Sequence, residues 1–215
     1  MVDLKIKAIV FDVGGVLALP KTPTTIKKRG HVHLGVHEYI AGKLGISLDQ
    51  WFDSIDTSYA KAIEGKISRN KTLSIISKNV KISPKKLEKI ILNAYKRDFK
   101  HNKELYKLAY KLRKNKYKIG ILSDQWYLSK QALISKKIIK RFNFTIISCD
   151  VGIRKPNLKI YKLMIKKLRL KPEEIIFIDN QEWNITPAEK LKINSILYKD
   201  NKQLIGELKK YAVVI

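Results

Sequence analysis

The sequence of 215 residues contains a single cysteine, Cys149. One cysteine excludes an intramolecular disulfide and a zinc site built from several thiolates. The sequence also lacks any run of about 18 apolar residues, so no membrane-spanning helix is expected. Its first residues, MVDLKIKAIVFD, lack the apolar region and small-residue cleavage site of a signal peptide. Together these absences favour a cytoplasmic protein without a membrane partner.

Acidic residues are also scarce, with 19 Asp and Glu against 45 Lys and Arg and a net charge of +26. Such an excess of positive charge is typical of proteins that bind nucleic acid or another polyanion. However, the lysines lie on the polar faces of several amphipathic segments, for example residues 85–97, instead of in one tail. Lysine outnumbers arginine 38 to 7, and arginine forms the better fork for phosphates and bases. We therefore favour a solvated lysine-rich surface and keep nucleic-acid binding as an alternative.

Five short apolar runs rich in β-branched residues predict buried strands. They cover residues 7–11, 118–122, 144–148, 175–178 and 195–198. Amphipathic helical segments separate the later four, and this alternation of strand and helix predicts a parallel sheet covered on both faces. The length and the 45% hydrophobic content fit one such core with a modest insertion.

The insertion lies between the first two predicted strands. Residues 21–99 contain no convincing strand and carry the signals of several helices. These signals are a capping box, a helix stop and a proline at a helix start, namely Ser47 with Gln50, Gly65, and Ser83 with Pro84. We therefore predict an α/β fold in which residues 1–20 and 100–215 form the core and residues 21–99 form a small helical domain above the sheet.

Polar residues follow the predicted strands at the points where the strands end. Asp12 follows the first strand and Ser123 the second, whereas Lys155 lies in the turn CDVGIRKPN after the third. Asp179 and Asn180 follow the fourth. Because ligands of open parallel sheets bind outside the carboxyl ends of the strands, these side chains are predicted to meet at one edge.

The predicted cluster suits phosphoryl transfer. The carboxylates of Asp12 and Asp179 are the oxygen ligands that a hard cation such as Mg²⁺ prefers. Lys155 can neutralise a phosphoryl group, Ser123 can donate a hydrogen bond to it, and Gly15 lets backbone amides approach it. Asp12 can then attack phosphorus and form an aspartyl-phosphate. Each residue alone has a structural alternative, such as a turn, a helix cap or a surface charge, so the prediction depends on their joint placement.

Four segments carry a family pattern in order: VFDVGGVL, ILSD, GIRKPNLKIY and IIFIDNQEWN. With these segments, nearly the whole chain resembles the haloacid dehalogenase-like hydrolase superfamily. The resemblance implies a Rossmann-like parallel-sheet core with an inserted α-helical cap at residues 21–99. The segments GVLALP and EGKIS are similar to those of the branch that includes small sugar-phosphate phosphatases and the phosphatase domain of soluble epoxide hydrolases.

The resemblance also implies a role for each predicted site residue. Asp12 is expected to be the catalytic nucleophile and a Mg²⁺ ligand, with Asp179 and the backbone carbonyl of Gly14 as further ligands. Ser123 and Lys155 are expected to bind the substrate phosphate. Lys155 is also expected to act in catalysis by stabilising the phospho-enzyme.

Gly14 departs from the family pattern, which usually has Asp at this position as the general acid and base. Glycine cannot transfer a proton, and acid–base catalysis typically contributes about 10²–10⁴-fold in rate. The enzyme is therefore expected to use a substrate with a good leaving group, to take the proton from another residue, or to turn over slowly. Asp124 and Asn180 also differ from the usual family choices, which are Asn and a second acid.

Three histidines in the predicted cap, His31, His33 and His37, offer a replacement acid or a transition-metal site. The plainer interpretation is that they are ordinary, partly exposed histidines. Among the three we name His31 as the candidate proton donor, because it lies near the start of the cap. Trp126 and Tyr127, just past the second predicted strand, either line the substrate pocket or, as is more common for aromatic residues, pack in the core.

The predicted function is a magnesium-dependent phosphatase that acts on a small phosphorylated metabolite through an aspartyl-phosphate. One alternative is a metal-independent 2-haloacid dehalogenase, which also uses an aspartate nucleophile. Asp179 argues against it, because that chemistry needs no metal carboxylate. The other alternative is a weakly catalytic or non-catalytic family member that binds nucleic acid, and a phosphatase for nucleotides or nucleic-acid ends would combine two of these hypotheses.

Overall fold

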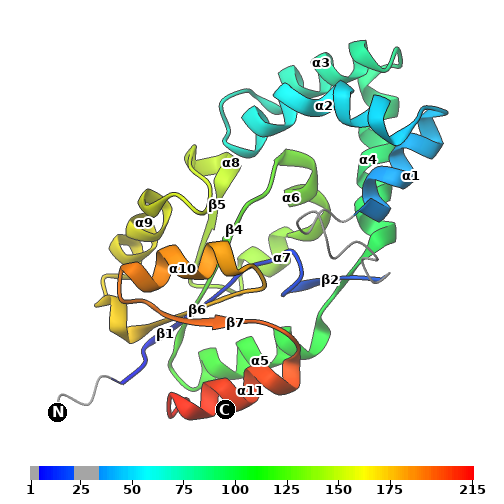
Figure 1. Cartoon of the computed structure of the whole chain (residues 1–215). Coiled ribbons are helices and arrows are strands. Elements are labelled where there is room, and N and C mark those ends of the chain that lie inside the picture. The colour runs from blue at the N-terminus through cyan, green and yellow to red at the C-terminus, as the bar shows by residue number, and fades with distance from the viewer. Residues whose placement is uncertain (1–4, 22–33) are drawn as a thin grey trace.

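The core of the molecule is a five-stranded parallel sheet with the strand order β5-β4-β1-β6-β7 (Figure 1). The computed structural model describes residues 5–21 and 34–215. The strands of this sheet are β1 (Ala8–Phe11), β4 (Lys118–Ser123), β5 (Phe144–Ile147), β6 (Ile175–Asp179) and β7 (Asn194–Leu197). All five predicted strands are confirmed to within one residue at each end, and every pairing is parallel.

Helices cover both faces of the sheet. They are α5 (Lys103–Lys114), α6 (Tyr127–Leu133), α7 (Lys136–Ile139), α8 (Ser148–Val151), α9 (Leu158–Leu168), α10 (Glu182–Lys190) and α11 (Asn201–Lys210), with a short 3₁₀ helix at Pro172–Glu174. Helices α5 and α11 pack against one face, and α9 and α10 pack against the other (Figure 1). This is the predicted layered α/β arrangement.

The central strand β1 shows why the sheet is buried on both sides. Ile9 and Phe11 belong to the hydrophobic cluster that contains α5 and α11. Ala8 and Val10 belong to the cluster on the opposite face with α9 and α10. A strand covered on both faces needs apolar side chains at every position, and the run AIVF supplies them.

In its described part, residues 34–99, the insertion between β1 and β4 contains four helices that stand beyond the carboxyl edge of the sheet (Figure 1). They are α1 (Leu34–Leu44), α2 (Leu48–Ile63), α3 (Arg69–Asn79) and α4 (Pro84–Asp98). The predicted capping box is present at the start of α2, where the Gln50 N–H donates to Ser47 Oγ at 3.1 Å and the Ser47 N–H to Gln50 Oε1 at 2.9 Å. Gly65 follows the end of α2 with a φ of 64°, and Ser83 caps α4. The division of the chain into a cap domain and a core domain stays a prediction.

Two short strands connect this insertion to the core. β2 (Ala18–Pro20) and β3 (Phe99–His101) pair in antiparallel fashion as a separate two-stranded sheet. Residues 21–99 were expected to contain no strand. β3 begins at residue 99, so it overlaps this range by one residue and corrects the expectation there. Strands of three residues give no periodic pattern, and the pairing partner lies far away in the sequence, so local analysis has nothing to detect.

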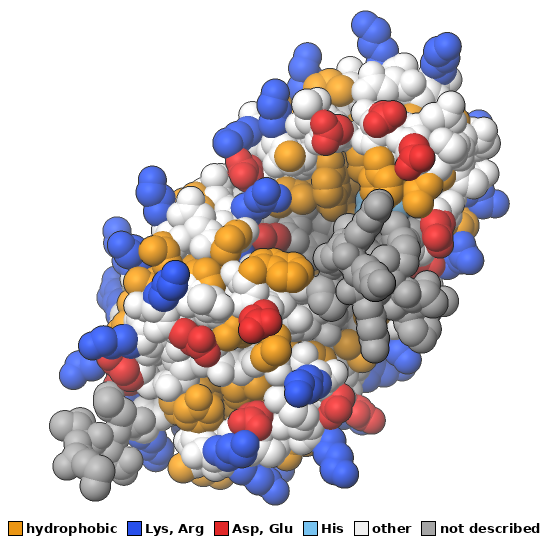
Figure 2. Space-filling view, in the orientation of Figure 1, with side chains coloured by type: hydrophobic (Ala, Val, Ile, Leu, Met, Phe, Trp, Pro, Cys, Tyr) orange, Lys and Arg blue, Asp and Glu red, His pale blue; other side chains and the backbone are white. Residues whose placement is uncertain are grey.

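The positive charge is spread over the surface. Figure 2 shows lysine and arginine side chains around both the core and the insertion on the visible face. In α4, for example, Leu87, Ile91 and Ala94 are buried while Lys85, Lys86 and neighbouring basic residues are exposed. In the described parts of the chain, no helix combines the length and apolar character needed to cross a membrane.

Candidate active site

Asp12 directly follows the central strand of the sheet. Its backbone N–H donates to the Ile178 carbonyl of β6 at 2.9 Å and so extends the ladder between β1 and β6. This position lies at the carboxyl edge of the sheet, where the ends of β4, β1 and β6 are neighbours. Asp12 is only 6% exposed, and a carboxylate buried to this degree needs a charged or hydrogen-bonding partner.

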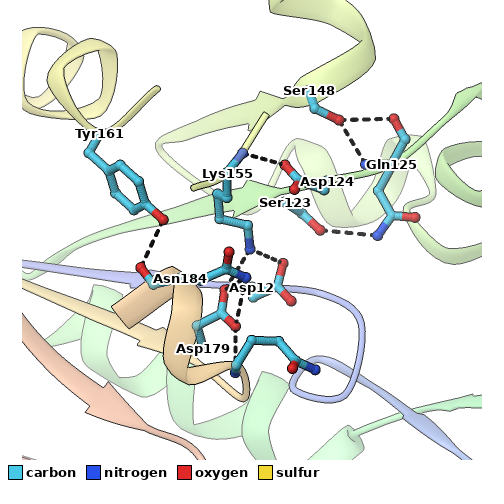
Figure 3. Close-up of polar contacts among 10 residues, drawn as sticks. Asp12, Ser123, Asp124, Gln125, Ser148, Lys155, Tyr161, Asp179 and Asn184 are labelled. Atoms are coloured by element: carbon cyan, nitrogen blue, oxygen red, sulfur yellow. Dashed lines mark hydrogen bonds and ion pairs between the residues drawn. The ribbon is translucent and has the colours of Figure 1, made fainter. Parts of the chain in front are cut away.

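Lys155 supplies this partner. It lies between α8 and α9, and its Nζ is 3.0 Å from Asp12 Oδ1 and 2.5 Å from Asp179 Oδ2 at the end of β6 (Figure 3). All three side chains are buried. The structure thus brings three of the predicted site residues, from three separate segments of the chain, into one cluster.

These surroundings shift the pKa values of the cluster. Burial raises the pKa of Asp12 to about 6, with help from the nearby charge of Asp179 and against the lowering effect of Lys155. Burial alone lowers the pKa of the Lys155 ammonium, but Asp12 and Asp179 outweigh burial and raise it well above its usual range. Lys155 is therefore a permanent cation at this edge of the sheet.

Asp179 is held by hydrogen bonds that the sequence analysis did not assign. The Gln181 N–H donates to Asp179 Oδ1 at 2.8 Å, and the Asn184 side-chain amide donates to Oδ1 and Oδ2 at 3.2 and 3.1 Å. The Tyr161 hydroxyl donates in turn to the Asn184 backbone carbonyl at 2.8 Å (Figure 3). Asn184 lies in the first turn of α10 and is the last residue of the segment IIFIDNQEWN. Its place in this segment was the signal in the sequence that could have identified it.

Ser123 is fully buried at the end of β4. Ser123 is among the groups that lower the pKa of Asp12, although burial has the larger, opposite effect. The Ser123 hydroxyl also accepts a hydrogen bond from the Gln125 side chain at 3.0 Å, and the Gln125 backbone N–H donates to Ser148 Oγ at 3.0 Å (Figure 3). Gln125 is a second residue of the site that the sequence analysis missed.

The turn after Asp12 contains Gly14 and Gly15, and its geometry requires glycine at position 15. Gly15 has a φ of 82°, and a Cβ added there would clash with the Asn180 side chain. Glycine at this position lets the turn approach the loop that follows β6. Gly14 lines the adjoining cavity and has open space where a Cβ would lie.

A cavity of about 530 Å³ lies between the carboxyl edge of the sheet and the insertion. Its floor carries polar groups of the core, which are Asp12, Asp124, Gln125, Arg154, Lys155, Asn180 and Gln181. Its other wall is mainly apolar and comes largely from the insertion, with Val36, Phe52, Ile55, Ile63 and Phe99 among its members. The volume is that of a site for a small molecule, with the charged cluster at one end.

The donor set at the floor fits a hard cation. Asp12 Oδ1 has only the ion pair with Lys155, and the buried oxygens Asn180 Oδ1 and Gln181 Oε1 accept no hydrogen bond. Uncommitted oxygen atoms are the ligands that Mg²⁺ takes. Within residues 5–21 and 34–215, no three His, Cys, Asp or Glu side chains are grouped as a metal site. Both Asp179 oxygens already accept hydrogen bonds from Lys155, Gln181 or Asn184, so a cation here would compete with these donors for Asp179 and would otherwise rely on Asp12 and neutral oxygens.

Of the three histidines in the predicted cap, His37 lies within the described residues. It is buried in α1, lines the cavity and accepts a hydrogen bond from Trp51 Nε1 at 2.8 Å. The expectation of a partly exposed histidine is therefore wrong for His37, because the indole N–H and the apolar side chains of α2 enclose it. His31 and His33 lie outside the described residues.

The two aromatic residues after β4 differ in their roles. Trp126 is buried, donates to Tyr95 OH at 2.9 Å and packs edge-on against Tyr59, so the core interpretation is confirmed for it. The Tyr127 hydroxyl donates to the Ile67 carbonyl at 3.0 Å and so contacts the insertion. Neither residue lines the cavity within the described part of the chain.

The parallel sheet and the buried polar cluster at its carboxyl edge define an α/β protein with a candidate active site. The chain belongs to the haloacid dehalogenase-like hydrolases, whose family model matches residues 6–192. It is 26% identical to bifunctional epoxide hydrolase 2 of Sus scrofa over 223 residues, which cover 96% of this chain and 39% of that protein. The chain thus spans about two fifths of the length of this relative.

Two further similarities come from other organisms. The chain is 29% identical over 114 residues to a glyceraldehyde 3-phosphate phosphatase of Pyrococcus furiosus, covering 49% of this chain and 46% of that one. A haloacid dehalogenase family enzyme of Bacteroides thetaiotaomicron, solved with magnesium and inorganic phosphate, matches with a TM-score of 0.73 and 22% identity over 93% of this chain and 98% of its own. At this identity the likeness shows the shared fold.

Proposed function

We propose that this chain is a magnesium-dependent phosphomonoester hydrolase for a small phosphorylated metabolite. The observation that supports this best is the buried cluster of Asp12, Lys155 and Asp179, in which Asp12 and Lys155 line the floor of the cavity. With both carboxylates ionised, the cluster has one surplus negative charge. A divalent cation reverses that sign, and the site then attracts a phosphate dianion. The magnesium and phosphate in the Bacteroides thetaiotaomicron enzyme and the name of the Pyrococcus furiosus relative agree with this proposal.

In the proposed reaction Asp12 is the nucleophile. Its carboxylate oxygen attacks phosphorus to give an aspartyl-phosphate, which water then hydrolyses. Lys155 and Ser123 hold the phosphoryl oxygens. The Gly15 N–H, which the sequence assigned to the phosphate site, instead donates to the Ala18 carbonyl at 2.8 Å, so Gly15 is not assigned to phosphate binding. Asp12, Asp179 and the Gly14 carbonyl would hold Mg²⁺, which neutralises charge on the phosphoryl group when it is bound.

A magnesium-dependent hydrolysis screen over many phosphorylated metabolites tests the proposal. Asp12→Asn keeps the shape of the side chain but removes the nucleophile, so turnover should fall by at least about 10³-fold. EDTA should abolish wild-type turnover, and added Mg²⁺ should restore it.

Phosphatase activity retained by Asp12→Asn would contradict the mechanism. Turnover of 2-haloacids that survives EDTA would instead support the metal-independent dehalogenase. Wild-type inactivity across the whole screen, together with salt-sensitive binding to DNA or RNA, would support the nucleic-acid-binding alternative.

A further inference from the structure

The proposed hydrolysis needs a proton for the departing oxygen, and Gly14 has no side chain to supply one. Three carboxylates line the cavity in the described part of the chain, namely Asp12, Asp56 and Asp124. Asp12 is the proposed nucleophile, and Asp56 is an exposed residue of α2. Asp124 is therefore the carboxylate to consider for proton transfer.

Asp124 is fixed at the edge of the phosphate site. It directly follows Ser123, and its Oδ1 accepts the backbone N–H of Lys155 at 3.1 Å (Figure 3). Its charge also raises the pKa of Tyr59, a cavity residue of α2. Asp124 therefore lies on the cavity floor beside the proposed phosphate site, and the organic part of a phosphate ester would lie toward the insertion.

We propose that Asp124 is the general acid and base of this enzyme and replaces the side chain that Gly14 lacks. The proposal rests on the proposed phosphatase function. It assigns the proton transfer to a residue of the core floor, whereas His31 was the candidate from the sequence. His37 is less suited, because it is engaged by Trp51 and packs against Phe52 with ring centroids 5.0 Å apart.

The surroundings of Asp124 favour the protonated form that the first step needs. Burial raises the pKa of the Asp124 carboxyl above its usual range, although Lys155 and Arg154 lower it. The charge of Asp179 raises it further, and the titratable group that faces it from the insertion is Tyr59. A carboxyl whose pKa is raised by burial can donate a proton in the first step and accept one in the second.

The two steps balance in atoms and charge. In the first, Asp12 forms a bond to phosphorus, the bond from phosphorus to the ester oxygen breaks, and that oxygen takes the proton of Asp124 to leave as an alcohol. In the second, the Asp124 carboxylate removes a proton from water as the water oxygen bonds to phosphorus. The bond between Asp12 and phosphorus then breaks, and inorganic phosphate, free Asp12 and protonated Asp124 remain.

The test compares two substrates that differ in their need for a proton. An alkyl phosphate must have its leaving oxygen protonated, whereas 4-nitrophenyl phosphate releases a stable phenolate. Asp124→Asn keeps an oxygen that accepts the Lys155 N–H, so the fold and the phosphate site should persist. The variant should lower kcat for the alkyl phosphate by about 10²–10⁴-fold. The pre-steady-state burst of nitrophenol should stay within about tenfold of wild type, and the phosphorylated chain should accumulate, because hydrolysis lacks its base.

Two further variants serve as control and rescue. Asp56→Asn removes the other cavity carboxylate and should leave both substrates unaffected. Gly14→Asp fits the open space at Gly14 and, combined with Asp124→Asn, should restore turnover of the alkyl phosphate. This rescue separates proton transfer from support of the Lys155 loop, because a new acid at position 14 cannot repair that loop.

The remaining outcomes overturn the proposal. Unchanged turnover of the alkyl phosphate by Asp124→Asn overturns the proposed role of Asp124. An equal loss of activity on both substrates, accompanied by a raised KM, also overturns it. A wild-type enzyme without any Asp12-dependent hydrolysis overturns the proposed function itself, whereas active wild type with an indifferent Asp124→Asn overturns the role of Asp124 alone.

Discussion

The central residue of the site, Asp12, is placed where its ionised form is costly. Two carboxylates share one ammonium in a buried cluster, and the raised pKa of Asp12, about 6, reflects burial and the charge of Asp179. An acid whose pKa is raised by folding binds more protons in the folded state than in the unfolded state between the two pKa values. The metal-free protein therefore loses stability as Asp12 ionises.

This loss can be measured against Asp12→Asn, in which the side chain cannot ionise. Between pH 4 and 7 in EDTA, the free energy of unfolding of wild type should fall relative to that of the variant by up to about 3 kcal/mol. The fall should lie between the ordinary pKa of 3.8 and the folded value of about 6. Urea unfolding at a series of pH values measures it, and titrating groups remote from Asp12 cancel in the difference. A difference that is constant with pH, or that grows in favour of wild type, would contradict the raised pKa.

At the scale of single residues, the sequence predicted the position of side chains that lie near the carboxyl ends of the strands. Asp12, Ser123, Lys155 and Asp179 meet because parallel strands bring their carboxyl ends to one edge. The bonds that fix the cluster were not predictable in the same way. Gln125 is fixed by a hydrogen bond to Ser148, which lies in a separate segment of the chain, and such a contact has no local signature.

At the scale of elements, the insertion meets the core at the end of α2. Gly65 lies there with a positive φ, and a Cβ at this position would clash with the backbone carbonyl of Cys149 in α8. Next to it, Glu64 pairs with Arg154 of the cavity floor at 3.4 Å. The sequence predicted Gly65 as a helix stop, but the close approach of two distant backbones could not be seen from the chain alone. This junction is one of the contacts between the insertion and the core, in addition to the packing of α4 against α6.

Gly65→Ala tests the junction, and Gly45→Ala is its matched control. Both glycines have φ near 65–70°, so alanine costs each roughly 1–2 kcal/mol in backbone strain, but a Cβ at Gly45 meets nothing. Gly45→Ala should lower Tm and leave kcat/KM unchanged. Gly65→Ala should also lower kcat/KM by about tenfold or more, because the walls of the cavity move apart. Equal kinetics in the two variants would show that the junction does not position the cavity.

At the scale of the whole molecule, the net charge of +26 is not concentrated at the cavity. In the described part of the chain, the charged groups that line it are Arg154 and Lys155 against Asp12, Asp56 and Asp124. Most of the basic side chains lie instead on exposed helix faces around the molecule (Figure 2). In the proposed function, the affinity for phosphate therefore comes from a few groups of the cavity, while the surface makes a long-range and unspecific contribution.

The separation of the basic surface from the cavity predicts how polyanions affect the protein. Duplex DNA of random sequence should bind only through the surface lysines, without sequence preference. Its affinity should fall steeply as the salt concentration is raised from 50 to 200 mM. If six phosphates are contacted, the fall should be about 10³-fold. Saturating DNA should leave kcat for a small phosphorylated substrate unchanged, since the nucleophile lies in a cavity that a duplex cannot enter. Titrations of labelled DNA at several salt concentrations, with parallel kinetics, test both statements. Tight binding that persists at high salt, or competitive inhibition by duplex ends, would instead favour a nucleic-acid substrate, because only direct occupation of the cavity links DNA binding to Asp12.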